Sequence, residues 1–454
     1  MKIMKKQICL AALLAVFSAS AASAQAPADS ASAPVVLTLE QALQTALSEN
    51  ASVRVADMEI EKTGYARKGT YSSLWPQVSG TGSYQRTIKK QVMYMDFAGE
   101  AGADGFEVGR WNTWSAGASA SMPLVNVQLW QSLKISDADV ELAVEKARSS
   151  RLETVAQVKQ AFYSCLLAKE VFDVYKSVYE NALVNLDHTQ KQYNAQRASE
   201  LDLTRAQATV ANAIPNVYDA ENSIMLGLWQ LKAVMGVDLD LNIDVAGSLE
   251  DYAGTMFRDI HTNDEVSLEG NSTMRQLAIQ AEELARAVKV QQAANIPTLA
   301  ASINYSVNAM TNDFEFSEYK WSPYSYVGLS LSIPIFAGGQ RSNAIKQAKV
   351  QAAELDVQRA DTERQLRISI RQNLNTMETA MNTYNAALSA EQSASKAYDI
   401  AQKSYKVGRS TFTDLDNAQL SLTQSRLSVC QAVYSFLNAK SSLEQTLGAD
   451  LTSE

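Results

Sequence analysis

Apolar residues recur along two long parts of the chain at alternating spacings of three and four residues. Ile370, Leu374, Met377, Met381, Tyr384 and Leu388 follow this rule, and so do Leu427, Cys430, Tyr434 and Leu437. The spacing is typical of a coiled coil, although an amphipathic helix on a globular core would share it. Length favours the coiled coil, because neither Gly nor Pro occurs at 124–214 or 340–407, and a helix over the second range would span about 100 Å.

Between these segments the apolar positions switch to every second residue. The alternation is clearest at 298–309, recurs at 114–122 and 327–333, and is weaker at 78–84. It predicts strands of about ten residues with one apolar and one small polar face, as in a transmembrane β-barrel, although a half-buried soluble sheet would look alike. Aromatic residues near the strand ends favour the membrane. They are Trp111, Trp114, Tyr319, Trp321, Tyr324 and Tyr326.

The chain contains two copies of one pattern. Tyr193, Asp202, Leu203, Ala206, Gln207 and Gly236 recur 212 positions later as Tyr405, Asp414, Leu415, Ala418, Gln419 and Gly448. Upstream, Asn50, Pro76 and Tyr84 recur at an offset of 221 as Asn271, Pro297 and Tyr305. Each copy is expected to form one structural unit. The four strands cannot close a barrel, so closure must be shared between chains, and three chains would give 12 strands and room for a channel.

The first 24 residues read as a secretory signal peptide. Three lysines precede an apolar run from Ile8 to Phe17, and Ala22-Ser23-Ala24 provides a cleavage site. No later stretch approaches the ~20 apolar residues of a transmembrane helix. The predicted compartment is therefore outside the cytoplasm.

Composition argues against several classes of function. The chain has only 2 His in 454 residues, too few for a typical histidine metal site or base, so we expect no enzyme activity, no catalytic residues, no metal and no cofactor. The net charge of −9 makes nucleic acid a poor partner. For Cys165 and Cys430 the sequence favours two buried thiols, and a disulfide stays possible in an oxidising compartment.

Several short motifs follow one another in a fixed order. They are Leu37-Thr38-Leu39-Glu40-Gln41-Ala42-Leu43 with a Thr38–Gln41 capping box, the junctions Trp75-Pro76-Gln77-Val78 and Ile296-Pro297-Thr298-Leu299, the strand exit Leu331-Ser332-Ile333-Pro334-Ile335-Phe336-Ala337-Gly338-Gly339, and Tyr405-Lys406-Val407-Gly408 with Asp414-Leu415. In this order they resemble the TolC-like outer membrane efflux proteins, and the resemblance covers essentially the whole mature chain.

The resemblance implies a mainly α fold with a pair of transmembrane β hairpins. Three chains would form a 12-stranded β-barrel in the outer membrane, continuous with a long α-helical barrel in the periplasm. The implied function is passive export of small molecules or polypeptides, in a tripartite efflux or type I secretion system. The implied partners are outer membrane lipid, a periplasmic adaptor and an inner-membrane pump of the resistance-nodulation-division or ABC type. A soluble periplasmic coiled-coil scaffold or adhesin is the alternative.

The same resemblance points to two tip turns, near 194–199 and 406–411, as the periplasmic gate. It implies that Asp202 and Asp414 are acidic groups near the entrance, that Tyr405 can bond Asp202 across neighbouring helices, and that Val407 and Gly408 contact the adaptor. Arg409 is a candidate for gate ion pairs. Helix capping and solvation are the alternative role for every tip residue. Gln196 departs from the family pattern, in which the first tip has Gly.

These observations divide the chain as follows. The expected parts are a signal peptide (1–24), an N-terminal segment with the first periplasmic helix (25–75), β hairpin 1 (76–123), long helices of the first repeat (124–235), an acidic equatorial segment (236–270), a periplasmic helix (271–296), β hairpin 2 (297–336) and long helices of the second repeat (337–454). The acidic segment lacks the spacing of a calcium loop, so a solvated band is expected there. The stretch from Lys90 to Arg110 is expected to be an extracellular loop.

Overall fold

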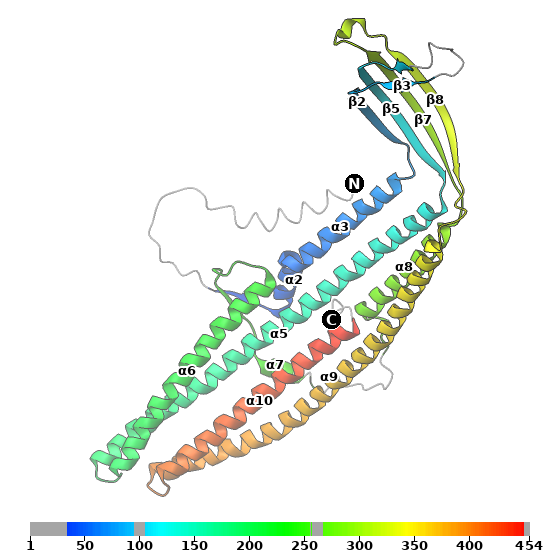
Figure 1. The fold of residues 1–454 in the computed structure, drawn as a ribbon. Helices are drawn as coiled ribbons and strands as arrows, with labels where there is room; N and C mark the ends of the chain where they lie inside the picture. Colours follow the sequence, from blue (N-terminus) through cyan, green and yellow to red (C-terminus); the bar gives the residue numbers. More distant parts are fainter. Residues whose placement is uncertain (1–33, 95–104, 255, 257–266, 449–454) are drawn as a thin grey trace, which may run out of the picture.

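The structure is a computed structural model that describes residues 34–94, 105–254, 256 and 267–448. The predicted signal peptide lies outside the described residues. The molecule is elongated, with a small sheet at one end and the ends of long helices at the other (Figure 1). It is mainly helical and built from two similar halves. The helices are α2 (Leu39–Glu49), α3 (Ala51–Ser72), α5 (Val127–Asn194), α6 (Glu200–Met235), α7 (Leu249–Ala253), α8 (Ser272–Ala293), α9 (Gln340–Lys406) and α10 (Phe412–Leu447).

Each half contains one long helix and a shorter helix that returns beside it. Helix α5 has 68 residues and α6 has 36, while α9 has 67 and α10 has 36. The long helices expected from the absence of Gly and Pro are confirmed. Helix α6 continues through Pro215 and Gly227, where propensity alone would favour an end. Within the described residues, no helix combines the length and the apolar character needed to cross a membrane.

Two pairs of shorter helices meet end to end: the N-terminus of α3 meets the C-terminus of α6, and the N-terminus of α8 meets the C-terminus of α10. Asn50 caps the N-terminus of α3 while its Nδ2 donates to Val234 O of α6, at 2.6 Å. Asn271 repeats this arrangement, capping α8 while donating to Thr446 O of α10 at 2.6 Å. We call these two contacts the asparagine clasps. Each joins a helix C-terminus to a helix N-terminus, so the opposite ends of two helix dipoles face one another.

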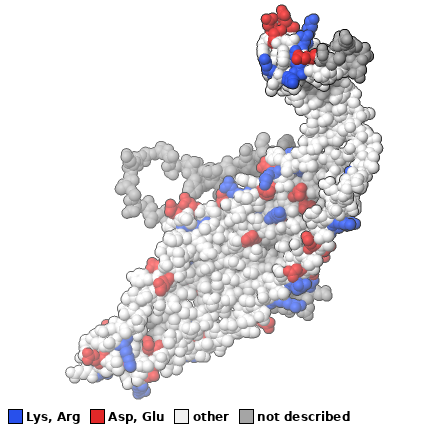
Figure 2. Space-filling model, viewed as in Figure 1, with Lys and Arg blue, Asp and Glu red and all other residues white. Residues whose placement is uncertain are grey.

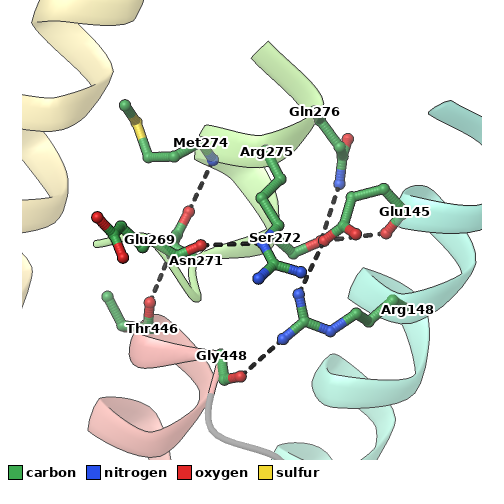
Figure 3. A network of polar contacts seen from close by, with 10 residues as sticks. All are labelled: Glu145, Arg148, Glu269, Asn271, Ser272, Met274, Arg275, Gln276, Thr446 and Gly448. Carbon is green, nitrogen blue, oxygen red and sulfur yellow. Dashed lines mark hydrogen bonds and ion pairs between the residues drawn. The ribbon is translucent and has the colours of Figure 1, made fainter. Parts of the chain in front are cut away.

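The clasp at Asn271 also contacts the long helix α5. Arg148 donates from Nη2 to Gly448 O at 2.8 Å and pairs with Glu145 at 3.0 Å (Figure 3). Ser272 Oγ donates to Glu145 O. Gly448 has a positive φ of 65° and lies against the backbone of Gly270, where a Cβ would collide. Three helices therefore converge on one compact junction.

Four long strands form an antiparallel sheet in the order β2–β5–β7–β8. They are β2 (Gln77–Arg86), β5 (Asn112–Val125), β7 (Thr298–Thr311) and β8 (Ser322–Ser332). Pairing of Ala116 with Val307 places the two repeats side by side at the centre. The short strands β3 (Gln91–Met93) and β4 (Phe106–Val108) pair within the expected extracellular loop, of which 95–104 lie outside the described residues.

The main core lies midway along the helices. It joins α2, α5, α6, α7, α9 and α10, and its fully buried side chains include Phe162, Leu231 and Phe436. Strand β1 (Val35–Leu37) pairs in parallel with β6 (Ile243–Val245) beside this core, a contact that the sequence did not predict. Cys165 is buried, Cys430 is partly buried, and both are free thiols.

The acidic segment is described only in part. Asp238, Asp240, Asp244, Glu250, Asp251 and Glu269 are described, while Asp259, Asp264 and Glu265 lie outside the described residues. Lys169 pairs with Asp244 at 2.6 Å and fastens the segment to α5. No group of three or more His, Cys, Asp or Glu side chains among the described residues could hold a metal ion.

Candidate functional site

The candidate site is the end of the molecule farthest from the sheet, where two helical hairpins turn (Figure 1). We call α5 and α6 with their turn hairpin 1, and α9 and α10 with their turn hairpin 2. The turns occupy 195–199 and 407–411, close to the predicted ranges. The offset of 212 relates the last residue of each descending helix, Asn194 and Lys406, and the first residue of each returning helix.

Both turns leave the descending helix through a left-handed residue. Arg197 N donates to Gln192 O and Arg409 N donates to Ser404 O, both at 2.8 Å, which is the Schellman pattern of helix termination. The left-handed position is Gly408 in hairpin 2, with φ of 73°, and Gln196 in hairpin 1, with φ of 58°. A non-glycine residue pays about 1–2 kcal/mol there. The departure seen at Gln196 in the sequence therefore leaves the turn intact and strained.

Both returning helices begin with a capping box. In hairpin 1, Ser199 Oγ donates to Asp202 at 2.7 Å and accepts from Asp202 N. In hairpin 2, Thr411 Oγ1 and N both donate to Asp414, at 2.7 and 2.9 Å. These bonds lower the pKa of Asp414, because the ionised carboxylate accepts both of them. Both aspartates therefore have the capping role that the sequence offered as the alternative.

Tyr405 is the central contact between the two hairpins. Its hydroxyl lies 2.7 Å from Thr189 Oγ1 of α5, and both side chains are buried. The Tyr405 ring also contacts His188 and Phe412. Burial raises the pKa of Tyr405, so its hydroxyl is neutral in the physiological range. The structure gives Tyr405 a bond to Thr189, whereas the sequence had named Asp202 as the partner.

A small apolar cluster surrounds this bond. It contains Ala206, Tyr398, Tyr405, Phe412, Leu415 and Leu422. Beside it, a cavity of about 20 Å³ is lined in part by Asn185, Thr209 and Gln419. Gln419 Oε1 has no hydrogen-bond partner among the residues that the structure describes. A cavity of that size with polar walls accommodates about one water molecule. The two hairpins thus contact one another near their turns through both polar and apolar side chains.

The remaining predicted site residues lie on the outer surface of the second turn. Val407 is 69% exposed, and Gly408 and Arg409 are also exposed. The Arg409 side chain forms no ion pair with any residue that the structure describes. Thr189 and Phe412 are the residues that sequence reasoning missed. The only signal for them was their position beside the duplicated tip motif.

These features define a class of protein: a duplicated helical hairpin fold with a small antiparallel sheet at the opposite end and no described catalytic or metal centre. The family model of the outer membrane efflux proteins matches residues 42–237 and 265–449. The chain therefore belongs to this family of outer membrane channels, which are not enzymes. The family prediction made from the motifs is confirmed.

Individual relatives are distant. The outer membrane protein TolC of Vibrio cholerae is 21% identical over 252 residues, which cover 54% of this chain and 57% of that protein. The probable efflux pump outer membrane protein TtgC of Pseudomonas putida is 24% identical over 324 residues, covering 69% of this chain and 62% of that protein. The alignments thus span about three fifths of the curated relatives' lengths.

Solved structures agree on the fold. The Campylobacter jejuni CmeC outer membrane channel has a TM-score of 0.72 at 18% identity, covering 90% of this chain and 85% of that one. VceC from Vibrio cholerae has a TM-score of 0.72 at 16% identity, covering 90% of this chain and 96% of that one. The two repeated halves, each with a long helix pair and strands, are therefore a shared architecture.

Proposed function

We propose that this chain is the outer membrane channel of a tripartite efflux or type I secretion system. Three copies form a 12-stranded barrel in the outer membrane and a helical tube in the periplasm. The tube passively conducts small molecules or polypeptides that an inner-membrane pump and a periplasmic adaptor deliver. The observation that supports this most directly is the sheet, which has an exposed apolar face and two unpaired edges.

The two faces of the sheet differ in chemistry. Val78, Ile303, Val327 and Leu329 share one face and are well exposed, with Val327 at 77%. On the other face, Ser79 bonds Ser119 and Ser83 bonds Ser115 across the strands. Charged residues gather beyond the distal end of the strands, and the strand region below them is largely uncharged (Figure 2). A barrel with this sheet in its wall would turn an apolar band to lipid and a hydroxyl-lined face to water.

The sheet is incomplete within one chain. Within the described part of the chain, strands β2 and β8 each have a partner on one side only, and unpaired backbone groups are costly in lipid. Pairing β2 of one copy with β8 of the next removes both edges. Three copies give 12 strands, enough for a channel, whereas two copies would leave a barrel filled by side chains.

The helices offer an independent argument for closure between copies. Ala138, Glu145 and Ala156 are buried on α5, and Ser272 of α8 bonds the Glu145 carbonyl. The offset of 212 carries these positions to Val350, Val357 and Ile368 on α9, which are exposed, Val357 at 71%. A second copy whose α3 and α6 lie against α9, as α8 and α10 lie against α5, would bury this apolar stripe.

The tips would form the periplasmic entrance. Trimerisation turns Asp202 and Asp414 each into a ring of three carboxylates, which attracts cations and resists anions. Tyr405 holds the hairpins together at this level, and Arg409 is available for an ion pair at the gate. Val407 and Gly408, exposed on the second turn, are proposed contacts for the adaptor.

Fractionation and planar-bilayer recordings test the proposal. The protein is expected in the outer membrane fraction, as a trimer in mild detergent, and to conduct ions in planar bilayers. Recovery in the soluble periplasm, or as a monomer in mild detergent, would instead support the scaffold or adhesin alternative. For the entrance, Asp202→Asn with Asp414→Asn should reduce cation preference, because asparagine retains the cap and removes the ring charge. Unchanged selectivity would remove both residues from the gate.

A further inference from the structure

A groove lies beside the main core, where α10 packs between α5 and α9 (Figure 1). Its volume is about 730 Å³, within the range of about 300–1,000 Å³ that is typical of small-molecule sites. Ala380 and Ala432 belong both to its wall and to the main core. Every described residue that lines it is uncharged. We call it the central groove.

The two long helices give the central groove unlike walls. Leu167 and Val171 of α5 form an apolar wall, while Thr379 and Thr383 of α9 form a wall of hydroxyl groups. The offset of 212 relates these positions to one another, so the second half has threonines where the first half has Leu and Val. The groove therefore offers a ligand apolar contact on one side and hydrogen bonds on the other.

The hydroxyl groups of this wall have no partner within the described part of the chain. Thr376, Thr379 and Thr383 are exposed and form no side-chain hydrogen bond with any residue that the structure describes. Other helical threonines bond the carbonyl of the preceding turn, as Thr189 and Thr423 do at 2.8 Å. The three hydroxyl groups can therefore donate to a ligand, or accept from it, without breaking an internal bond.

The central groove and helix α7 lie on opposite faces of these helices. Leu249 of α7 lines a second cavity, of about 360 Å³, together with Arg426 and Cys430 of α10. Gln424 and Ser428, which line the central groove, are each two residues away from these, or about 200° around the helix. Three copies of α7 pointing inward would obstruct a tube that conducts cargo. In the proposed channel α7 therefore lies outside and the central groove faces the lumen.

The outer cavity is charged, whereas the central groove is not. Glu170, Asp173 and Glu250 line the outer cavity, and its Arg426 pairs with Glu391 at 3.2 Å. A charged ligand that entered the central groove would lose water and find no ion pair among its walls. An uncharged ligand loses less, and its apolar part gains contact with the α5 wall. The groove thus discriminates between ligands by their charge.

We propose that the central groove is a cargo subsite in the lumen, which binds uncharged amphipathic molecules of drug size during export. The apolar part of such a molecule lies against Leu167 and Val171, and its polar groups bond Thr376, Thr379 and Thr383. Each chain contributes one groove, so a trimer has three of them around the lumen. The inference names a substrate class for the proposed channel and rests on that function.

Equilibrium dialysis of the purified protein in mild detergent measures this binding directly. The probes are chloramphenicol, which is uncharged and amphipathic, and its hemisuccinate ester, which carries a carboxylate; detergent without protein is the blank. Chloramphenicol should bind at one site per chain, and the hemisuccinate about tenfold more weakly. Thr379→Val with Thr383→Val should weaken chloramphenicol binding about tenfold, the effect of two modest hydrogen bonds. Thr362→Val, on α9 outside the groove, should leave binding unchanged.

A charge placed in the groove provides a test in which binding is gained. Gln431 of α10 lines the groove and is exposed, so Gln431→Lys adds a cation there without disturbing the core. This variant should bind the hemisuccinate at least as tightly as chloramphenicol, whereas Gln431→Asn should retain the wild-type preference. An unchanged preference in Gln431→Lys would show that the probes bind elsewhere and would overturn the inference.

Planar-bilayer recordings separate this inference from the proposed channel. Chloramphenicol added on the side of the sheet should interrupt the current in brief events, which the double valine variant shortens about tenfold. Absence of any conductance, together with binding that the valine variant weakens, would contradict the proposed function and leave the groove as a binding site. Conductance that the probe does not interrupt, or binding that the valine variant leaves unchanged, would overturn the cargo subsite.

Discussion

The middle of the molecule and its tips are built from the same helices but held in different ways. In the middle, six helices and a strand pair enclose one continuous core, with Phe162, Leu231 and Phe436 fully buried, and the asparagine clasps fix the ends of four helices. At the tips a six-residue cluster, the Thr189–Tyr405 bond and polar contacts such as Arg205 with Thr413 join the hairpins. The difference teaches that one pair of long helices can enclose a continuous core over one part of its length and be joined by a small cluster over another.

The largest effect expected from this comparison concerns two phenylalanines of α10. Phe436→Ala in the middle should cost about 3–5 kcal/mol and lower the temperature of global unfolding, because the surrounding core cannot collapse into the cavity. Phe412→Ala at the tip should leave that temperature nearly unchanged and raise hydrogen exchange only in 186–210 and 398–422, since a weakly held end opens locally. Thermal unfolding in detergent and exchange mass spectrometry measure the two effects. Equal loss of global stability in both variants would show that the tip is not a separate unit.

A smaller effect is expected from pH. Burial and the neighbouring Asp139 raise the pKa of Glu283 on α8 from 4.5 to about 7, so the folded state binds a proton more tightly than the unfolded chain. This stabilisation is complete below pH 4.5 and is lost as pH rises through 7, about 1–2 kcal/mol after allowance for solvent screening. At the tip the sign is opposite, because the pKa of Asp414 is lowered from 3.8 by its bonds to Thr411. The stabilisation from this cap is present above pH 3.8 and is lost as pH falls through the folded pKa.

Unfolding temperatures between pH 5 and pH 8 test this contrast. The wild-type protein should be more stable at pH 5, and Glu283→Gln should flatten that part of the profile, because the amide does not titrate. Asp414→Asn serves as the control and should leave the profile between pH 5 and pH 8 unchanged. A flat wild-type profile would contradict the assignment to Glu283.

The smallest effect is expected at the two turns. Gln196→Gly should stabilise the tip of hairpin 1 by about 1 kcal/mol, because glycine adopts the left-handed conformation without strain. Gly408→Ala should destabilise hairpin 2 by a similar amount. Exchange rates of the amides next to each turn measure both changes, and opposite signs are required. Faster exchange in Gln196→Gly would show that the Gln196 side chain compensates for its backbone strain.

Local signals in the sequence predicted much of the fold. The Thr38–Gln41 capping box, the helix start at Asn271 and the turn at Gly408 all appear as expected, because each depends on residues within a few positions of one another. Helix α6 passes through Pro215 against local preference, since a long packed helix can outweigh one lost bond.

Local sequence signals did not predict contacts between residues that lie far apart in the chain. Thr189 and Tyr405 are 216 positions apart, and helical spacing reports which face of α5 is apolar without stating which residue of α9 will lie against it. The pairing of β1 with β6 was missed for the same reason: three-residue strands have too little pattern to be recognised. The roles of Asp202 and Asp414 as caps were open alternatives, and the bonds to Ser199 and Thr411 seen in the structure distinguish them.

In the proposed trimer, the internal duplication has a consequence for how the tube can evolve. A ring of six identical half-length chains would have six identical borders, and any substitution that loosened one border would loosen all of them. Once two halves are fused in one gene, mutations such as those separating Thr189 from Ala401 and Phe412 from Glu200 can alter alternate borders independently. After fusion the six borders are no longer identical. Selection can therefore strengthen the borders inside each chain and weaken those between chains independently.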